Sequence, residues 1–80
     1  MAQACIEKKI RLNKILSYLR DFAAKEETFS YKKFRAVVVF EMGITNQKFE
    51  EYIQVFEDMG VIRRSEDTVF PIKDELFKND

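Results

Sequence analysis

The chain contains only two glycines, Gly43 and Gly60, and the segment between them constrains the fold more than any other. Apolar side chains recur in this segment every three or four residues, which is the spacing of one face of a helix. These side chains are Phe49, Tyr52, Ile53, Phe56 and Met59. Thr45 can cap the start of the helix with its hydroxyl, and Gly60 suits the left-handed residue that follows a helix end. We therefore predict a helix over residues 46–59 that turns sharply into a strand at Val61.

Two more helices are predicted upstream of this segment. Residues 6–25 have a helical pattern with one apolar face, formed by Leu12, Ile15, Leu16, Leu19, Phe22 and Ala23. Ser30 can cap a second helix over residues 31–42, whose apolar stripe consists of Tyr31, Phe34, Val37, Val38 and Met42. The run 36–40 is rich in β-branched residues and could instead form a strand. We favour the helix because the stripe keeps the helical period, and because Ser30 and Gly43 bracket it at helical length.

The last part of the chain is predicted to form a β-hairpin. Residues 61–64 and 68–72 have the composition of two strands, and the polar residues 65–67 form a short turn between them. Pro71 either ends the second strand or places it at the edge of the sheet, because proline has no N–H to donate. A very short strand over residues 28–29 can add to this sheet, which then has two or three strands.

Residues 73–80 form a tail, in which one helical turn is expected to lay Leu76 and Phe77 onto the body of the protein. The whole chain has 80 residues, which is the size of one domain. Its predicted class is mainly α with a small β-hairpin. A domain of this size buries only about 60–65% of its unfolded surface, so its stability is marginal unless it oligomerises.

The charges balance over the whole chain but are unevenly distributed along it. Residues 1–40 contain nine Lys or Arg and four Asp or Glu, which gives +5. Residues 41–80 contain five Lys or Arg and ten Asp or Glu, which gives −5. Such a distribution allows a basic face that could meet nucleic acid without making the whole protein basic.

Several classes of protein are excluded by what the sequence lacks. It has no apolar run of about 18 residues and no apolar secretion signal, so we expect no membrane partner. The run KDEL at 73–76 is internal and is not a retention signal. One cysteine, Cys5, excludes an internal disulfide and fits a reducing intracellular compartment.

The inventory of reactive side chains predicts no enzyme. The chain has no histidine and a single cysteine, which rules out a Cys/His zinc site and a histidine-dependent catalytic triad. It also shows no nucleophile–base pair and no glycine-rich loop of the kind that cradles phosphate. We therefore expect no cofactor, no metal and no small-molecule substrate.

Two runs of sequence resemble the winged helix-turn-helix superfamily. They are F-S-Y-K-K-F at 29–34 and F-E-M-G-I-T-N-Q-K-F-E-E-Y-I-Q-V-F-E-D-M-G-V-I at 40–62. In that superfamily the second helix ends at a Gly-Ile/Leu-Ser/Thr turn, and Gly-Val/Ile after the third helix starts the wing; residues 43–45 and 60–62 hold these places. The resemblance covers about residues 10–72, and it consists of caps and apolar positions, so it concerns fold more than function.

The resemblance implies a winged helix, which is a three-helix bundle with a two- or three-stranded antiparallel wing, here at residues 61–72. The small size and compact wing resemble the stand-alone DNA-binding winged helices of archaea and of their viruses and plasmids. In such domains the third helix enters the major groove of double-stranded DNA. We therefore expect sequence-specific DNA binding by a transcriptional regulator.

The residues implied in DNA contacts fall into two groups. Those placed to read bases are Asn46, Gln47, Lys48, Glu51 and Gln54. Those placed to contact the DNA backbone are Tyr31, Lys32 and Lys33 at the start of the second helix, and Arg63 and Arg64 in the wing. Adjacent strand residues face opposite ways, so only one of the two arginines can lie on the outer face.

The charge of the predicted helix 46–59 argues against DNA. Lys48 is outnumbered there by four acidic side chains, a local sum of −3, at Glu50, Glu51, Glu57 and Asp58. The polar face of this helix is therefore also compatible with a merely solvated surface, or with a winged helix that binds protein within a larger assembly. The basic residues of the first helix more often solubilise a helix than bind nucleic acid: Lys8, Lys9, Arg11 and Lys14.

Surplus apolar residues suggest a homodimer, since a single small winged helix makes few DNA contacts and specific sites usually comprise two half-sites. Ile6 and Ile10 lie opposite the main apolar face of the first helix. Either this end of the helix frays, or the C-terminal tail or a second subunit covers the two residues. The candidate interface consists of Cys5, Ile6, Ile10, Val39 and Phe40. Cys5 could also form an intersubunit disulfide across a two-fold axis.

Overall fold

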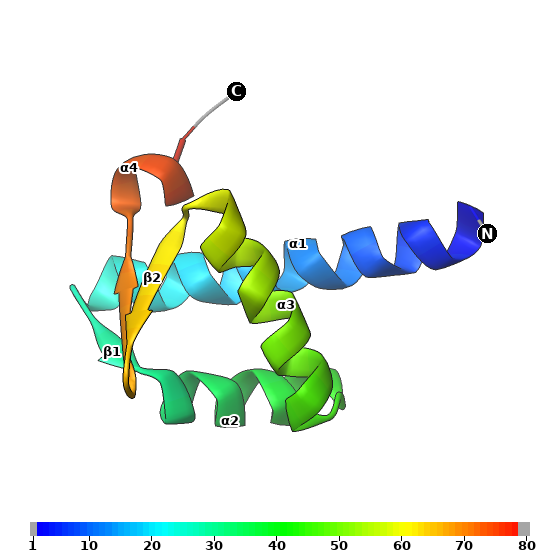
Figure 1. Ribbon diagram of the computed structural model, residues 1–80, viewed down its shortest axis with the longest axis horizontal. Helices are drawn as coiled ribbons and strands as arrows, with labels where there is room; N and C mark the ends of the chain where they lie inside the picture. The colour runs from blue at the N-terminus through cyan, green and yellow to red at the C-terminus, as the bar shows by residue number, and fades with distance from the viewer. Residues whose placement is uncertain (1, 79–80) are drawn as a thin grey trace.

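The computed structural model describes residues 2–78, with side chains described from Glu7 onward. The chain is mainly helical, with one small antiparallel sheet (Figure 1). In chain order its elements are α1 (Ala2–Lys25), β1 (Phe29–Ser30), α2 (Tyr31–Met42), α3 (Asn46–Met59), β2 (Ile62–Ser65), β3 (Thr68–Pro71) and α4 (Lys73–Leu76).

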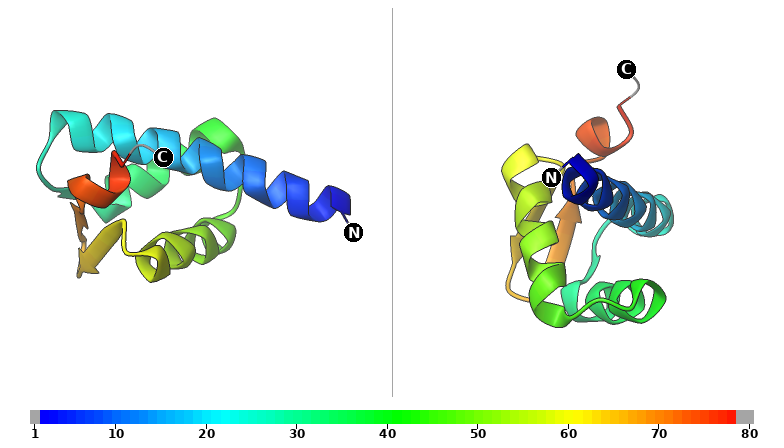
Figure 2. Two further views of the ribbon diagram at one scale, coloured as in Figure 1. Left: turned by 90° about the horizontal axis from the view of Figure 1, so that it is seen from above. Right: turned by 90° about the vertical axis from the view of Figure 1, so that its right-hand side faces the viewer.

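The helices are arranged with α1 and α2 along the length of the molecule and α3 crossing them (Figures 1 and 2). The sheet closes the end at which α1 finishes and α2 begins. The N-terminal part of α1 extends past the rest of the protein, as Figure 1 and the left view of Figure 2 show. α1 therefore crosses α3 and continues beyond it.

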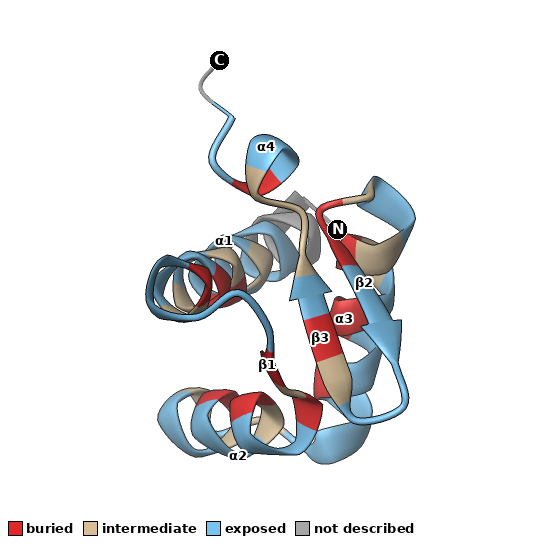
Figure 3. Cartoon of the chain, turned by 90° about the vertical axis from the view of Figure 1, so that its left-hand side faces the viewer, coloured by how far each residue is buried: buried red, intermediate tan, exposed pale blue. Residues whose placement is uncertain are grey.

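The sheet has three antiparallel strands in the order β1-β3-β2, so β3 is the central strand (Figure 3). Phe29, Ile62 and Val69 are buried on the face that meets the helices. Pro71 is the last residue of β3 and lies opposite Ile62. Of the two predicted roles for Pro71, ending the strand is therefore the one observed, and an edge position for β3 is wrong.

The core is a continuous set of aromatic and aliphatic side chains from every layer. Phe34 of α2 is fully buried and contacts Phe22 of α1, with ring centroids 5.0 Å apart. It also packs against Phe29 at 5.4 Å and Phe49 at 5.8 Å. Aromatic pairs of this kind each contribute about 0.5–1.5 kcal/mol beyond the burial of their area. The ring of Phe34 thus packs against aromatic side chains from both halves of the chain.

The helix ends follow from local chemistry. The hydroxyl of Ser30 accepts a hydrogen bond from the Lys33 amide at 3.3 Å, and Thr45 does the same for Lys48 at 3.1 Å. Gly43 and Gly60 follow the ends of α2 and α3 with positive φ of 65° and 79°, a conformation that costs other residues free energy. The bounds of α2 and α3 coincide with those predicted.

Several sequence predictions need correction at their edges. The strand alternative for residues 36–40 is wrong, because these residues lie within α2. The helix α1 begins at Ala2 instead of residue 6. The strands β1 and β2 each start and end one residue later than predicted, and β3 stops at Pro71.

Three apolar residues that were predicted to pack against the protein are in fact exposed. Val37 is 40% exposed because the buried face of α2 runs through Tyr31, Phe34 and Val38, which leaves Val37 at its margin. Met59 is 59% exposed at the last position of α3. Phe77 is 43% exposed, so only Leu76 of the tail packs onto the body.

The hairpin turn is attached to the start of α2 through Asp67. Its main-chain oxygen accepts from the Tyr31 amide at 2.6 Å, and its carboxylate accepts from the Lys32 amide at 3.0 Å and from the Ser30 hydroxyl at 2.7 Å. The hydrogen bond from Ser30 and that from the Lys32 amide lower the pKa of Asp67, with further help from the charges of Lys32 and Arg35. Negative charge at a helix N-terminus is stabilising.

Replacing Asp67 with Asn is expected to lower the melting temperature at neutral pH and to flatten its dependence on pH. The folded pKa of Asp67 lies below the unfolded value of about 3.9, so its contribution is complete above that value and is lost as pH falls through the folded pKa. Thermal unfolding followed by circular dichroism from about pH 7 to about pH 2 measures both effects.

Asp21→Asn, at an exposed position on α1, is the matched control and should behave as the wild type. Equal loss of melting temperature on acidification in wild type and Asp67→Asn would contradict this role for Asp67.

Candidate nucleic-acid interface

The polar face of α3 is open to solvent. All five residues predicted to read bases are exposed: Asn46, Gln47, Lys48, Glu51 and Gln54. The opposite face of the same helix is buried through Phe49, Tyr52, Ile53 and Phe56. α3 therefore has one buried and one solvent-exposed face. The first turn of the exposed face carries amide and ammonium groups.

The side chains on this face make weak contacts with one another. Lys48 Nζ lies 3.5 Å from Glu51 Oε1, and Gln54 Nε2 donates to Asp58 Oδ1 at 3.0 Å. Exposed ion pairs on a helix contribute only about 0.3–0.5 kcal/mol. Such contacts can be exchanged for contacts with a ligand at little cost.

The start of α2 also faces solvent, with Lys32 and Lys33 both exposed. The hairpin turn lies beside them, because Asp67 bonds the Lys32 amide. The carboxylates of Glu66 and Asp67 in that turn reduce the local positive charge.

Tyr31 is a core residue, which corrects its predicted role as a contact to the DNA backbone. It is only 7% exposed, and its ring lies 5.7 Å from that of Phe49. Its hydroxyl is buried, so a phosphate has no access to it. Burial raises the pKa of this hydroxyl, and the charge of Arg64 opposes that effect.

Arg64 lies on the inner side of β2, where it joins three elements. Its guanidinium sits over the Tyr31 ring, 4.4 Å from the centroid, and its Nε is 3.4 Å from Glu57 Oε1 on α3. About two thirds of the Arg64 side chain is covered, since its side-chain exposure is 32%. Arg64 therefore secures the hairpin to α2 and α3, although part of its side chain also borders a groove on the hairpin.

Arg63 points the other way, as the alternation of a strand requires. It pairs across the sheet with Phe70, which is 42% exposed, and both residues line a shallow groove on the hairpin together with Arg64 and Ser65. Because Arg64 is engaged by Glu57 and the Tyr31 ring, Arg63 is the better candidate of the two for an external phosphate.

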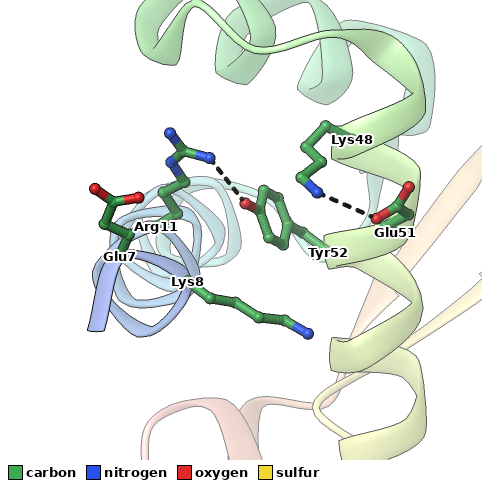
Figure 4. A pocket seen from close by; sticks show the side chains of 6 residues that line it. All are labelled: Glu7, Lys8, Arg11, Lys48, Glu51 and Tyr52. Carbon is green, nitrogen blue, oxygen red and sulfur yellow. Dashed lines mark hydrogen bonds and ion pairs between the residues drawn. The ribbon is translucent and has the colours of Figure 1, made fainter. Parts of the chain in front are cut away.

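A cleft between α1 and α3 brings together residues that lie about forty positions apart (Figure 4). It is lined by Glu7, Lys8, Arg11, Lys48, Glu51 and Tyr52, and its volume is about 210 Å³. Nη1 of Arg11 donates to the Tyr52 hydroxyl at 3.4 Å, and this hydrogen bond raises the pKa of Arg11. The sequence predictions missed this cleft. The feature of the sequence that pointed toward it was the basic composition of the first helix.

Two residues of the predicted dimer interface are well exposed: Phe40 is 84% exposed and Ile10 is 58% exposed. Val39 is partly buried and packs against the core. The side chains of Cys5 and Ile6 lie outside the described residues.

The described part of the C-terminal tail, residues 73–78, does not cover Ile10, which argues against one of the explanations given for it. Arg20 Nε donates to the Leu76 carbonyl at 2.9 Å, which places α4 against the second half of α1. Ile10 lies on the first half and remains exposed.

No protein-family model, curated protein or solved structure matches this chain. Among the described side chains, residues 7–78, no three His, Cys, Asp or Glu are grouped so that they could hold a metal ion. None of the helices described is both long and apolar enough to cross a bilayer.

Replacing Arg64 with Ala is expected to lower the free energy of unfolding by about 1–2 kcal/mol, because a partly covered ion pair and a cation–π contact are lost together. Arg63→Ala, the adjacent change of equal charge, should alter it by less than about 0.5 kcal/mol. Urea unfolding of both variants measures the difference. Equal effects at the two positions would show that Arg64 has no structural role.

Proposed function

We propose that this chain is a winged-helix protein that binds double-stranded DNA inside the cell and acts as a homodimeric transcriptional regulator. The observation that carries the proposal is the solvent-exposed polar face of α3, which follows α2 after a short turn. The strand order β1-β3-β2, with β1 between the first two helices, is compatible with the same superfamily. In this proposal α3 enters the major groove.

The acidic residues of α3 weigh less against DNA than their number suggests. Glu57 is turned inward and paired with Arg64, so it leaves the exposed face. One lysine and three acidic side chains remain on that face, a sum of −2 instead of −3. Asp58 lies in the last turn of α3, away from the residues that reach base edges first.

The proposed contacts follow the exposure of each side chain. Asn46 and Gln47 stand in the first turn of α3, where amide groups can bond adenine in a bidentate manner. Lys48, Glu51 and Gln54 complete the set that faces bases. Lys32, Lys33 and Arg63 are proposed to contact the DNA backbone. Tyr31 and Arg64 are instead given structural roles within the protein.

Titration of a fluorescent random-sequence duplex is expected to show binding at about 50 mM salt that weakens steeply as salt rises. Lys32→Ala and Lys33→Ala should each weaken binding to every duplex and reduce the salt slope by about one. Gln47→Ala should leave the slope unchanged and reduce the preference for selected sequences. Lys78→Ala, remote from this surface on the tail, serves as the charge-matched control.

A wild-type protein that binds no duplex at low salt would refute the proposal. So would equal losses of affinity in the Lys33 and Lys78 variants, since the interaction would then be general charge attraction.

A homodimer is proposed because Phe40 and Ile10 are apolar side chains exposed by 84% and 58% on a chain too small for many DNA contacts. Sedimentation at micromolar concentration should give a dimer for the wild type and a monomer of 9.6 kDa for Phe40→Glu. Phe77→Glu, a similar change at the exposed tail, should remain dimeric. A monomeric wild type would contradict the dimer.

The second candidate function is a winged-helix module that binds a protein. The net negative charge of the exposed α3 face and the exposed ring of Phe40 favour it. A nuclease-treated pull-down that recovers a stoichiometric protein partner, together with no duplex binding, would favour this alternative over DNA.

A further inference from the structure

We infer that the cleft between α1 and α3 holds one backbone phosphate of the bound duplex, through Lys8, Arg11 and Lys48. This inference rests on the proposed DNA binding and extends it to α1, the helix to which no DNA contact was assigned. Three basic side chains from two helices converge on the same cleft (Figure 4). The chemistry recognised is that of a phosphodiester.

Arg11 is held in place before any ligand arrives. Its Nη1 donates to the hydroxyl of Tyr52, whose ring is buried in the core and only 3% exposed. A guanidinium carries five N–H donors, so this hydrogen bond leaves others for phosphate oxygens. Anchoring through a buried tyrosine lowers the entropy that Arg11 loses when it binds.

Lys48 faces the same cleft from the opposite side. Its Nζ lies 6.0 Å from the centroid of the Tyr52 ring and 3.5 Å from Glu51. Tyr52 therefore stands between Arg11 and Lys48, as Figure 4 shows. A phosphate near the Tyr52 hydroxyl would be within the reach of both cations.

The charge of the cleft distinguishes it from the rest of α3. Lys8, Arg11 and Lys48 outnumber Glu7 and Glu51, a net charge of +1. The exposed face of α3 alone sums to −2. The Lys48 and Glu51 charges cancel, so the α1 side chains make this flank of the helix net positive, which favours a polyanion there.

The position of the cleft suits a DNA strand that borders the groove entered by α3. Lys48 and Glu51 belong both to the cleft and to the proposed base-reading face, so the two surfaces are continuous. The N-terminal part of α1 extends past the body and brings Lys8 and Arg11 alongside α3 (Figures 1 and 4). Phosphates flanking the major groove lie within such reach of the helix that occupies it.

The test compares two double variants of the full chain that remove equal charge from the same helix. Lys8→Ala/Arg11→Ala alters the cleft, and Lys9→Ala/Lys14→Ala alters exposed positions that do not line it. Affinity for one random-sequence duplex is measured by fluorescence anisotropy at several salt concentrations, and thermal unfolding of each variant confirms that it is folded.

The cleft variant is expected to bind about tenfold more weakly at about 0.1 M salt and to lose about one from the salt slope, because one phosphate is no longer neutralised. The control variant should stay within about twofold of the wild type, with an unchanged slope. Equal losses in the two variants would overturn the inference while leaving DNA binding intact. A wild-type protein that binds no duplex would refute both this inference and the proposed DNA binding.

Glu51→Gln provides a test that does not depend on loss of function. Removing this negative charge beside the phosphate should strengthen binding to random duplexes about two- to threefold, since a like charge is taken away from the cleft. Unchanged or weaker binding to random duplexes would count against a phosphate at this position.

Discussion

The packing of Phe34 is the interaction on which the other elements depend. Its fully buried ring on α2 meets Phe22 from α1, Phe29 from β1 and Phe49 from α3, all with centroids within 5.8 Å. A domain of this size has a net stability of only about 4–12 kcal/mol, so contacts of this kind form a large share of it. Because the three partners come from separate elements, their mutual orientation is set around one side chain.

Polar contacts then fix the hairpin on this core. Asp67 binds the turn to the first amides of α2, and Arg64 joins β2 to α2 through the Tyr31 ring and to α3 through Glu57. Both contacts engage groups that the sequence alone would leave available for ligands. The result is a short hairpin whose turn lies against the helix, and Arg63, beside the groove on this hairpin, is its proposed ligand contact.

The distribution of charge links this architecture to the proposed DNA contact. The basic first half of the chain and the acidic second half are separate in sequence, but α1 and α3 cross in space. Lys8 and Arg11 are thereby placed beside an acidic helix that could not attract a polyanion alone. The overhang of α1 has a functional explanation in these terms, since it carries charge to the flank of α3.

Local chemistry allowed the sequence to determine the helices. The caps at Ser30 and Thr45 and the left-handed glycines at 43 and 60 act over a few residues, so α2 and α3 could be located to the residue. The apolar period also identified most of the core. The three-stranded order of the sheet could be anticipated only as an alternative, because strand pairing joins residues far apart in the chain.

Tertiary structure alone decided which polar side chains are available. Tyr31 and Arg64 carry groups suited to DNA. Packing nevertheless places Tyr31 in the core and the guanidinium of Arg64 over the Tyr31 ring. The cleft between α1 and α3 depends on the angle at which two helices cross, and helical periodicity contains no information about that angle. The sequence by itself determined where α2 and α3 begin and end, whereas the folded chain determined which residues a partner can reach.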